Sequence, residues 1–211
     1  MPSADEAVIT TAHTYNTSAD AWRAYHGEDR TDWQPTYKRF TELVPRDSRV
    51  LDLGCGPGLD APALTAAGLR CIGLDVSVRL LELAAKEPAL IGRVMLGDLR
   101  SLPYTDGAFD AVWAGGSMHH IARSEIKAAL AEVARVTKVG GVFMASVERG
   151  DGEGYAVDLD NVADARWYAC YEPDEWRAML RRLDFAMVDA QMGDPSKHSR
   201  NGWFAIFARK R

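Results

Sequence analysis

Short apolar runs alternate with longer amphipathic stretches along most of this chain. The runs are rich in Val, Ile, Leu and aromatic residues, which is typical of strands buried on both faces of a parallel sheet. They span residues 49–54, 70–75, 93–98, 109–114 and 141–148. Regular alternation of such strands with helices predicts an α/β fold, in which helices cover both faces of a doubly wound, mostly parallel sheet.

Two of the intervening helices have recognisable ends. Ser77 is expected to cap a helix over 78–87, and Pro88 should end it. Ser124 is expected to cap a second helix over 125–138. The apolar residues of that helix fall on one face, and two glycines follow it, as they commonly do at helix ends.

The alternation stops after Glu148. Residues 149–161 form a polar, glycine-containing stretch that we interpret as a loop, and Pro173 is expected to open one more helix. Two final strands are expected at 185–191 and 202–210.

The segment before the first strand has a weaker pattern. Helical spacing occurs around 19–26 and 32–43, outside the alternating core. We therefore expect an N-terminal helical cap or lid over residues 1–44, within the same domain as the main α/β unit over 45–211.

Composition and charge narrow the class of protein. The chain has 211 residues, which suits one domain, and its formal net charge is −5. A broad basic surface for nucleic acid is therefore not expected. The start of the chain lacks the basic and apolar regions of a signal peptide, and no apolar run approaches the roughly 20 residues of a membrane span. We expect a soluble, cytoplasmic protein with no membrane partner, as a monomer or homodimer.

The three cysteines indicate neither a disulfide framework nor a zinc site. Cys55, Cys71 and Cys170 are far apart and form no C-x-x-C pair, which fits a reducing compartment. Three acidic residues, Glu148, Asp151 and Glu153, lie in or next to a glycine-rich stretch and are interpreted as solvated, so no metal is expected.

The stretch "VLDLGCGPGLD" (50–60) carries the candidate chemistry. Gly54, Gly56 and Gly58 form G-x-G-x-G directly after a predicted strand, where open parallel sheets bind ligands. A dinucleotide fingerprint would need glycine at the position of Leu59. Asp52 would also repel a pyrophosphate, whereas it would attract an ammonium group.

Two further acids end the next two predicted strands. Asp75, some twenty residues after the loop, is placed to accept both hydroxyls of a ribose, as in any adenosine cofactor. Asp98 is placed to accept the adenine amino group, with Leu99 beside the ring. S-adenosylmethionine suits this set, because it has an adenosine, no phosphate and an ammonium.

Four motifs in unbroken order resemble the class I S-adenosylmethionine-dependent methyltransferases. They are "VLDLGCGPG", "GLDVS", "GDLRSLPYTDGAFDAVWAGGSMHHI" and "ALAEVARVTKVGGVFMASV", and they cover about residues 45–150. The C-terminal part, with "GWFAIFARK", resembles the end of small bacterial members. The resemblance implies a Rossmann-like, seven-stranded sheet whose last strand is antiparallel. Val139 replaces the proline common in the family, which loses only turn stiffness.

The resemblance also implies roles for individual residues. The backbone of the glycine loop would line the methionine part of the cofactor, Asp52 would face its ammonium, and an N-terminal tyrosine would close over it. The implied cofactor-binding residues are Tyr15, Asp52, Gly54, Cys55, Gly56, Asp75, Val76, Asp98, Leu99 and Gly115.

The candidates for catalysis are His119 and His120, at the end of the fourth predicted strand. A base is needed only where the methyl acceptor must lose a proton, and histidine titrates in the right range. Either histidine is also compatible with a structural role. The aromatic residues between Trp167 and Tyr171 suit a substrate wall or core packing equally, and the same holds for Trp22 and Trp33.

The sequence thus favours methyl transfer from S-adenosylmethionine to a small-molecule O, N or C nucleophile, releasing S-adenosylhomocysteine. A methyltransferase acting on tRNA or protein and a non-catalytic S-adenosylmethionine-binding protein remain open alternatives. An NAD-dependent oxidoreductase is disfavoured by Asp52 and Leu59.

Overall fold

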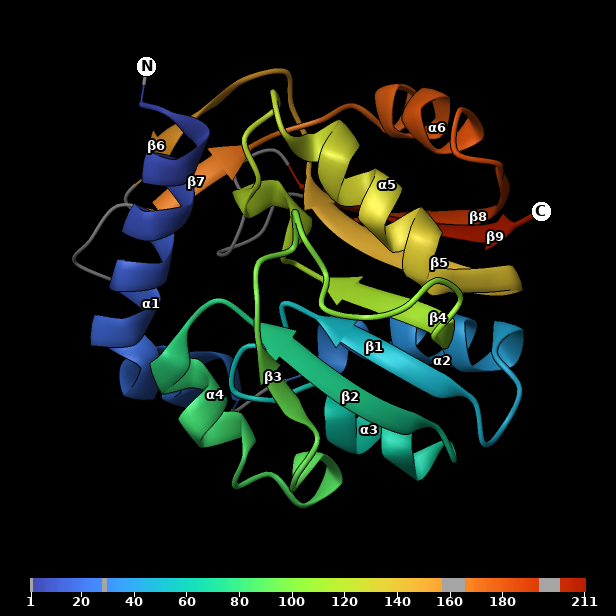
Figure 1. Cartoon of the computed structure of the whole chain (residues 1–211), viewed down its shortest axis with the longest axis horizontal. Helices are drawn as coiled ribbons and strands as arrows, with labels where there is room; N and C mark the ends of the chain where they lie inside the picture. The colour runs from blue at the N-terminus through green and yellow to red at the C-terminus, as the bar shows by residue number, and fades with distance from the viewer. Residues whose placement is uncertain (1, 28–29, 157–165, 194–201) are drawn as a thin grey trace.

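The computed structural model describes residues 2–27, 30–156, 166–193 and 202–211. Its centre is a seven-stranded sheet in the order β3-β2-β1-β4-β5-β9-β8 (Figure 1). The strands are β1 (Arg49–Leu53), β2 (Arg70–Asp75), β3 (Val94–Leu96), β4 (Phe109–Gly115), β5 (Thr137–Glu148), β8 (Phe185–Met192) and β9 (Trp203–Lys210). Strand β9 pairs antiparallel with both neighbours, and the pairs from β3 to β5 are parallel. The predicted α/β fold with an antiparallel last strand is confirmed.

Two apolar cores lie on opposite faces of this sheet, because successive residues of a strand point to opposite sides. On one face, Leu51 packs with the apolar residues of α5 (Ile126–Val136) and α6 (Pro173–Arg181). On the other face, Val50 packs with α2 (Gln34–Leu43), α3 (Ala61–Ala66) and α4 (Val78–Ala84). Figure 1 shows these helices on their two sides of the sheet.

The N-terminus differs from the two short helices predicted. Helix α1 (Ala4–Gly27) is a single helix of 24 residues, and the predicted segment 19–26 is only its end. The short 3-10 turn η1 (Thr31–Trp33) then leads into α2. The buried apolar residues of α1 are Ala7 and Ala19, so the helix has only a weak apolar stripe to reveal it.

Of the two helix caps predicted from the sequence, the structure has one and lacks the other. Ser77 caps α4, since its Oγ accepts a hydrogen bond from the Leu80 amide over 3.2 Å. The helix ends at Ala84, and Pro88 begins a 3-10 turn, η2 (Pro88–Leu90). The predicted Ser124 cap is wrong. Helix α5 has no side-chain cap, because its first turn is closed by the Ala122 carbonyl, which accepts backbone hydrogen bonds.

A second, two-stranded sheet joins β6 (Glu153–Ala156) to β7 (Arg166–Ala169). Part of the predicted loop 149–161 is therefore a strand, and 157–161 lies outside the described residues. Strand β7 places Trp167 against Ala7 of α1, and Tyr171 lies in the main core. For these two aromatic residues the core interpretation is correct, because neither lines the pocket described below.

Candidate functional site

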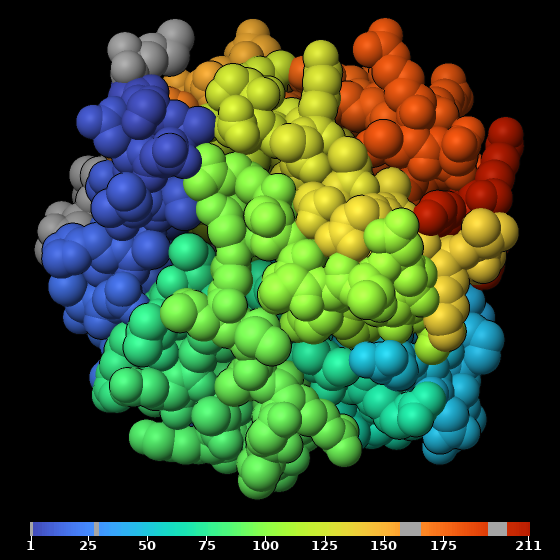
Figure 2. Space-filling model, viewed as in Figure 1, coloured from blue at the N-terminus to red at the C-terminus, as the bar shows by residue number. Residues whose placement is uncertain are grey.

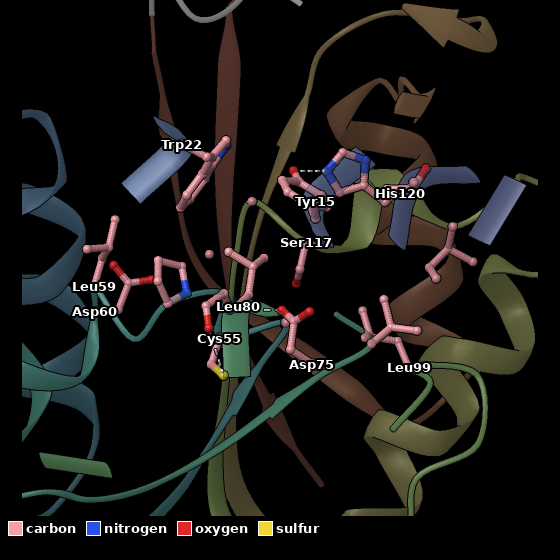
Figure 3. Close-up of a pocket in the computed structure, with 18 of the residues that line it drawn as sticks. Tyr15, Trp22, Cys55, Leu59, Asp60, Asp75, Leu80, Leu99, Ser117 and His120 are labelled. Atoms are coloured by element: carbon pink, nitrogen blue, oxygen red, sulfur yellow. Dashed lines mark hydrogen bonds between the residues drawn. The ribbon is translucent and has the colours of Figure 1, made fainter. Parts of the chain in front are cut away.

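The strands β1, β2 and β4 end on the side of the sheet where α1 lies (Figure 1). A pocket opens at their carboxyl ends (Figure 3). Its volume is about 830 Å³, counting the solvent at its mouth. Nine of the ten predicted cofactor residues line it, together with the predicted catalytic residue His120. They are Tyr15, Gly54, Cys55, Gly56, Asp75, Val76, Asp98, Leu99 and Gly115. Asp52 and His119 are not among its lining residues. The space-filling view shows α1 packed along one side of the molecule (Figure 2).

The glycine loop is held tightly between two strands. The Gly54 amide donates to the Leu74 carbonyl over 2.8 Å, and the Ser117 hydroxyl donates to the Leu53 carbonyl over 2.6 Å. Gly54 has a φ of +73°, and a Cβ there would lie 2.3 Å from the Ser117 Cβ. Only glycine fits this close approach, which brings the loop backbone to the wall of the pocket.

Asp75 lines the pocket beside Cys55 of the glycine loop, on the side away from Tyr15 and His120 (Figure 3). Its two oxygens accept hydrogen bonds from the Gly56 amide and the Ser77 amide, both over 2.8 Å. Burial raises the pKa of this carboxyl, and the amide hydrogen bonds act against the rise. These bonds fix the orientation of a carboxylate whose further lone pairs can accept from a bound hydroxyl.

Asp98 lines the pocket but already has a strong partner. Its carboxylate accepts from the Arg100 guanidinium over 2.7 Å, and Arg100 also pairs with Asp5 of α1 over 2.9 Å. Leu99 beside it is buried. The Asp98 carboxylate therefore links the end of β3 to α1 through Arg100, and its predicted contact with an adenine amino group stays a prediction.

Asp52 lies behind the loop rather than on the pocket surface. Its side chain is buried, and its Oδ2 has no hydrogen-bond partner among the described residues. Burial raises the pKa of this carboxyl well above its usual range, with smaller contributions from Asp60 and Asp75. The predicted contact of Asp52 with an ammonium stays a prediction.

Replacing Asp52 with asparagine is expected to raise the melting temperature of the ligand-free protein at pH 7. The wild-type carboxyl has a raised pKa when folded, so the unfolded state releases its proton first and stability falls as pH rises above about 4. The asparagine side chain does not ionise in this pH range, so position 52 of the variant adds no such loss of stability. Melting curves from pH 4 to pH 8 should therefore show the Asp52→Asn advantage growing with pH, and an advantage independent of pH would contradict this account.

A cluster of polar and aromatic residues around Asp60 was not predicted from the sequence. The Asp60 carboxylate accepts from Trp113 Nε1 over 2.9 Å, from the Tyr37 hydroxyl and from the Arg30 guanidinium. Asp60 and Arg30 both line the pocket, and Arg30 also lies over the Trp33 ring at 4.7 Å. Asp60 directly follows the glycine loop, which was a usable signal, whereas nothing local marked Arg30.

The same cluster explains why position 115 is glycine. A Cβ on Gly115 would lie 2.7 Å from Trp113 Nε1 and 2.9 Å from Asp60 Oδ2. Any side chain at position 115 would therefore clash with the Trp113–Asp60 hydrogen bond, so this position at the end of β4 requires glycine. Trp22, left ambiguous by the sequence, lines the pocket, while Trp33 packs against the Trp113 ring at 6.0 Å.

His120 and Tyr15 meet across the pocket wall. Tyr15 Oη lies 2.8 Å from His120 Nε2 (Figure 3). The other ring nitrogen of His120 lies 2.6 Å from the Trp167 carbonyl. Arg166 of β7 donates to Tyr15 Oη over 2.9 Å. Its side chain is buried, and no sequence pattern predicted a role for it. The three hydrogen-bonded side chains of His120, Tyr15 and Arg166 form a row. This row joins α1, the short turn η3 (Met118–His120) and β7.

His119 is an aromatic packing residue. It is buried, stacks on Tyr168 with 5.0 Å between ring centres, and contacts the Trp203 ring edge-on at 4.9 Å. Burial, followed by the nearby His120 and Arg166, lowers its pKa well below the usual range. Its position behind the pocket wall leaves the catalytic role predicted for it without structural support.

Comparisons with known proteins show which family this chain resembles. The family model described as "Methyltransferase domain" matches residues 51–145. An uncharacterized methyltransferase, YcgJ of Bacillus subtilis, is 32% identical over 154 residues, covering 69% of this chain and 60% of that protein. The chain belongs to the class I S-adenosylmethionine-dependent methyltransferase superfamily. This confirms the family predicted from the sequence motifs.

Other similar proteins of the superfamily extend the comparison. A demethylmenaquinone methyltransferase of Mycolicibacterium gilvum is 36% identical over 115 residues, covering 54% of this chain and 47% of that protein. A solved structure of the Burkholderia thailandensis 1,6-didemethyltoxoflavin-N1-methyltransferase, with 1,6-didemethyltoxoflavin and S-adenosylhomocysteine bound, has a TM-score of 0.79 at 21% identity. The structural match covers 100% of this chain and 91% of the Burkholderia thailandensis chain. The chain spans about half to three-fifths of the length of these curated relatives.

Two further properties of the described residues bear on the class of site. No group of three or more His, Cys, Asp or Glu side chains in them is placed to hold a metal ion. Nor does the described part of this superfamily member contain a helix with the length and apolar character of a membrane span.

Proposed function

We propose that this chain transfers a methyl group from S-adenosylmethionine to a small-molecule nucleophile. The observation that carries the proposal is the pocket at the strand ends. It combines a glycine loop, an oriented carboxylate and the Tyr15–His120 pair around one space of about 830 Å³.

The residues present fit the cofactor. Asp75 would accept the ribose hydroxyls, because its carboxylate is already fixed by two amides and borders the pocket. Leu99 and Val76 would contact the adenine, and the backbone of Gly54 to Gly56 would lie along the methionine part. When bound, the cofactor supplies a sulfonium methyl group, and the chain's own task is to hold acceptor and methyl in line.

A small acceptor suits the enclosure of the site. Helix α1 borders the pocket through Tyr15 and Trp22 and so covers one side of it. Two relatives are named as methyltransferases of small molecules, demethylmenaquinone and 1,6-didemethyltoxoflavin. These observations support a small-molecule acceptor over tRNA or protein.

Isothermal titration with S-adenosylmethionine tests cofactor binding, and we expect a stoichiometry near 1:1. Incubation with methyl-labelled cofactor and fractions of a cell extract then tests transfer. We expect label in a low-molecular-weight product. Label in bulk tRNA or protein would favour the macromolecular alternative, and binding without any transfer would favour a non-catalytic binder. No binding at millimolar cofactor would rule the proposal out.

A further inference from the structure

The directions of the hydrogen bonds around His120 can be assigned from its partners. The Trp167 carbonyl can only accept, so His120 Nδ1 carries the proton of that 2.6 Å bond. In the neutral ring Nε2 is then an acceptor, and the Tyr15 hydroxyl donates to it over 2.8 Å. The Tyr15 oxygen in turn accepts from Arg166 Nη1.

The surroundings keep the His120 ring neutral. Burial, and then the positive charge of Arg166, lower its pKa to about 3, while the hydrogen bond to Trp167 acts in the opposite direction. The other titratable rings that face it are Tyr15, His119 and Tyr168, at 4.2 to 5.4 Å between ring centres. None of them brings a carboxylate next to the imidazole.

The row has the geometry of a proton relay that ends at the phenol. His120 Nε2 is occupied by the Tyr15 hydroxyl, so an acceptor cannot reach that nitrogen without displacing Tyr15. Tyr15 itself lines the pocket, and the Arg166 guanidinium beside its oxygen stabilises negative charge there.

We propose that Tyr15 Oη, and not His120, is the group that receives the acceptor's proton, while the Tyr15 proton passes to His120 Nε2. This inference rests on the proposed methyl transfer. The acceptor's O–H or N–H bond breaks and its proton goes to Tyr15 Oη, and the phenol O–H bond breaks toward the imidazole. The electron pair left on the acceptor atom forms the bond to the methyl carbon, while the bond from that carbon to sulfur breaks and its electron pair stays on sulfur, so that S-adenosylhomocysteine is the leaving group.

The proposed step conserves the net charge of the pocket. The positive charge that leaves the cofactor's sulfur on methyl transfer reappears on the imidazole, so the net charge of the pocket does not change. The relay also defines the acceptor class. It serves a hydroxyl or an N–H group that must lose a proton, and it has no use for a thioether or a tertiary amine.

Tyr15→Phe is the direct test, because it keeps the ring that packs on Trp22 and removes only the hydroxyl. On the labelled product formed by wild type, we expect kcat to fall roughly 100-fold or more, as for a lost general base. The dissociation constant for S-adenosylhomocysteine should stay within about threefold. The deficit should shrink as pH rises, because hydroxide can then remove the acceptor's proton, and a purely structural role would not produce that trend.

The matched control is Tyr25→Phe, since Tyr25 lies on the same helix but is exposed and does not line the pocket. Its rate should equal that of wild type. A double variant with His120→Asn should lose little beyond Tyr15→Phe alone, because residues acting as one unit are not additive. An unchanged kcat in Tyr15→Phe, or a fully additive double variant, would overturn the relay.

A second measurement needs no acceptor. Nitrogen NMR of protein labelled at histidine, with S-adenosylhomocysteine bound, should show His120 neutral and protonated on Nδ1 from roughly pH 6 to 8. Removal of the Tyr15 hydroxyl should shift only the Nε2 signal of that ring. An imidazolium, or a proton on Nε2, would refute the relay even where cofactor binding and the proposed function hold.

Discussion

Replacing Asp75 with alanine is expected to weaken binding of S-adenosylhomocysteine about 100-fold. Hydrogen bonds to a charged group contribute about 1.5–3 kcal/mol each, and a ribose would make two to this carboxylate. Even the lower value for both gives about 3 kcal/mol, which is two powers of ten in the dissociation constant. Titration calorimetry on the purified variant measures this directly.

The matched control for this prediction is Asp110→Ala. Asp110 also accepts a backbone amide, that of Arg49, and pairs with Lys138, but it lies at the amino-terminal end of the strands. Its loss should leave the dissociation constant unchanged. Asp75→Asn keeps the shape and should fall between wild type and alanine. Binding within threefold of wild type in Asp75→Ala would show that this carboxylate does not hold the ribose.

Gly54→Ala is expected to destabilise the fold by about 3 kcal/mol or more. A left-handed φ costs an alanine roughly 1–2 kcal/mol, and overpacking typically adds 1–3 kcal/mol. Here the new Cβ would lie 2.3 Å from the Ser117 Cβ. For a chain of this size we expect the melting temperature to drop by about 10 °C, as measured by circular dichroism or scanning calorimetry.

Alanine substitutions at two other glycines separate the cost of the left-handed backbone from the cost of the steric clash. Gly92 has a φ of +68° with nothing within 4 Å of its Cβ position, so Gly92→Ala reports backbone strain alone. Gly152 has open space around it and no left-handed φ, so Gly152→Ala should be nearly neutral. Adding Ser117→Gly to Gly54→Ala should recover part of the loss. A Gly54→Ala loss no greater than that of Gly92→Ala would mean that the clash is relieved by a small shift.

The features that could be predicted from the sequence were those encoded locally. The strands are continuous apolar runs, and the glycine loop with Asp75 at the end of β2 forms a spaced pattern that the fold brings to one edge. For the same reason the Ser77 cap could be predicted, since the bond spans three residues. The family was predicted from these local motifs.

The features that could not be predicted depend on contacts between distant residues. Arg166 meets Tyr15 across 151 positions, and Arg30 meets Asp60 across 30. No pattern around either arginine distinguishes it from a solvated one. His119 and His120 are neighbours in the sequence, and only the turn η3 directs one ring to the core and the other to the pocket.

Helix α1 is attached to the rest of the molecule by two small apolar clusters and by several polar contacts. Asn16 accepts from the Ser77 hydroxyl, Thr11 accepts from the Trp167 amide, and the buried apolar residues of the helix are alanines. Such an element can open locally at a small free-energy cost while the sheet stays folded. A ligand beneath it would then leave faster whenever the helix detaches. Residence time, and through it the ceiling on turnover, would thus depend in part on the few hydrogen bonds that hold this helix.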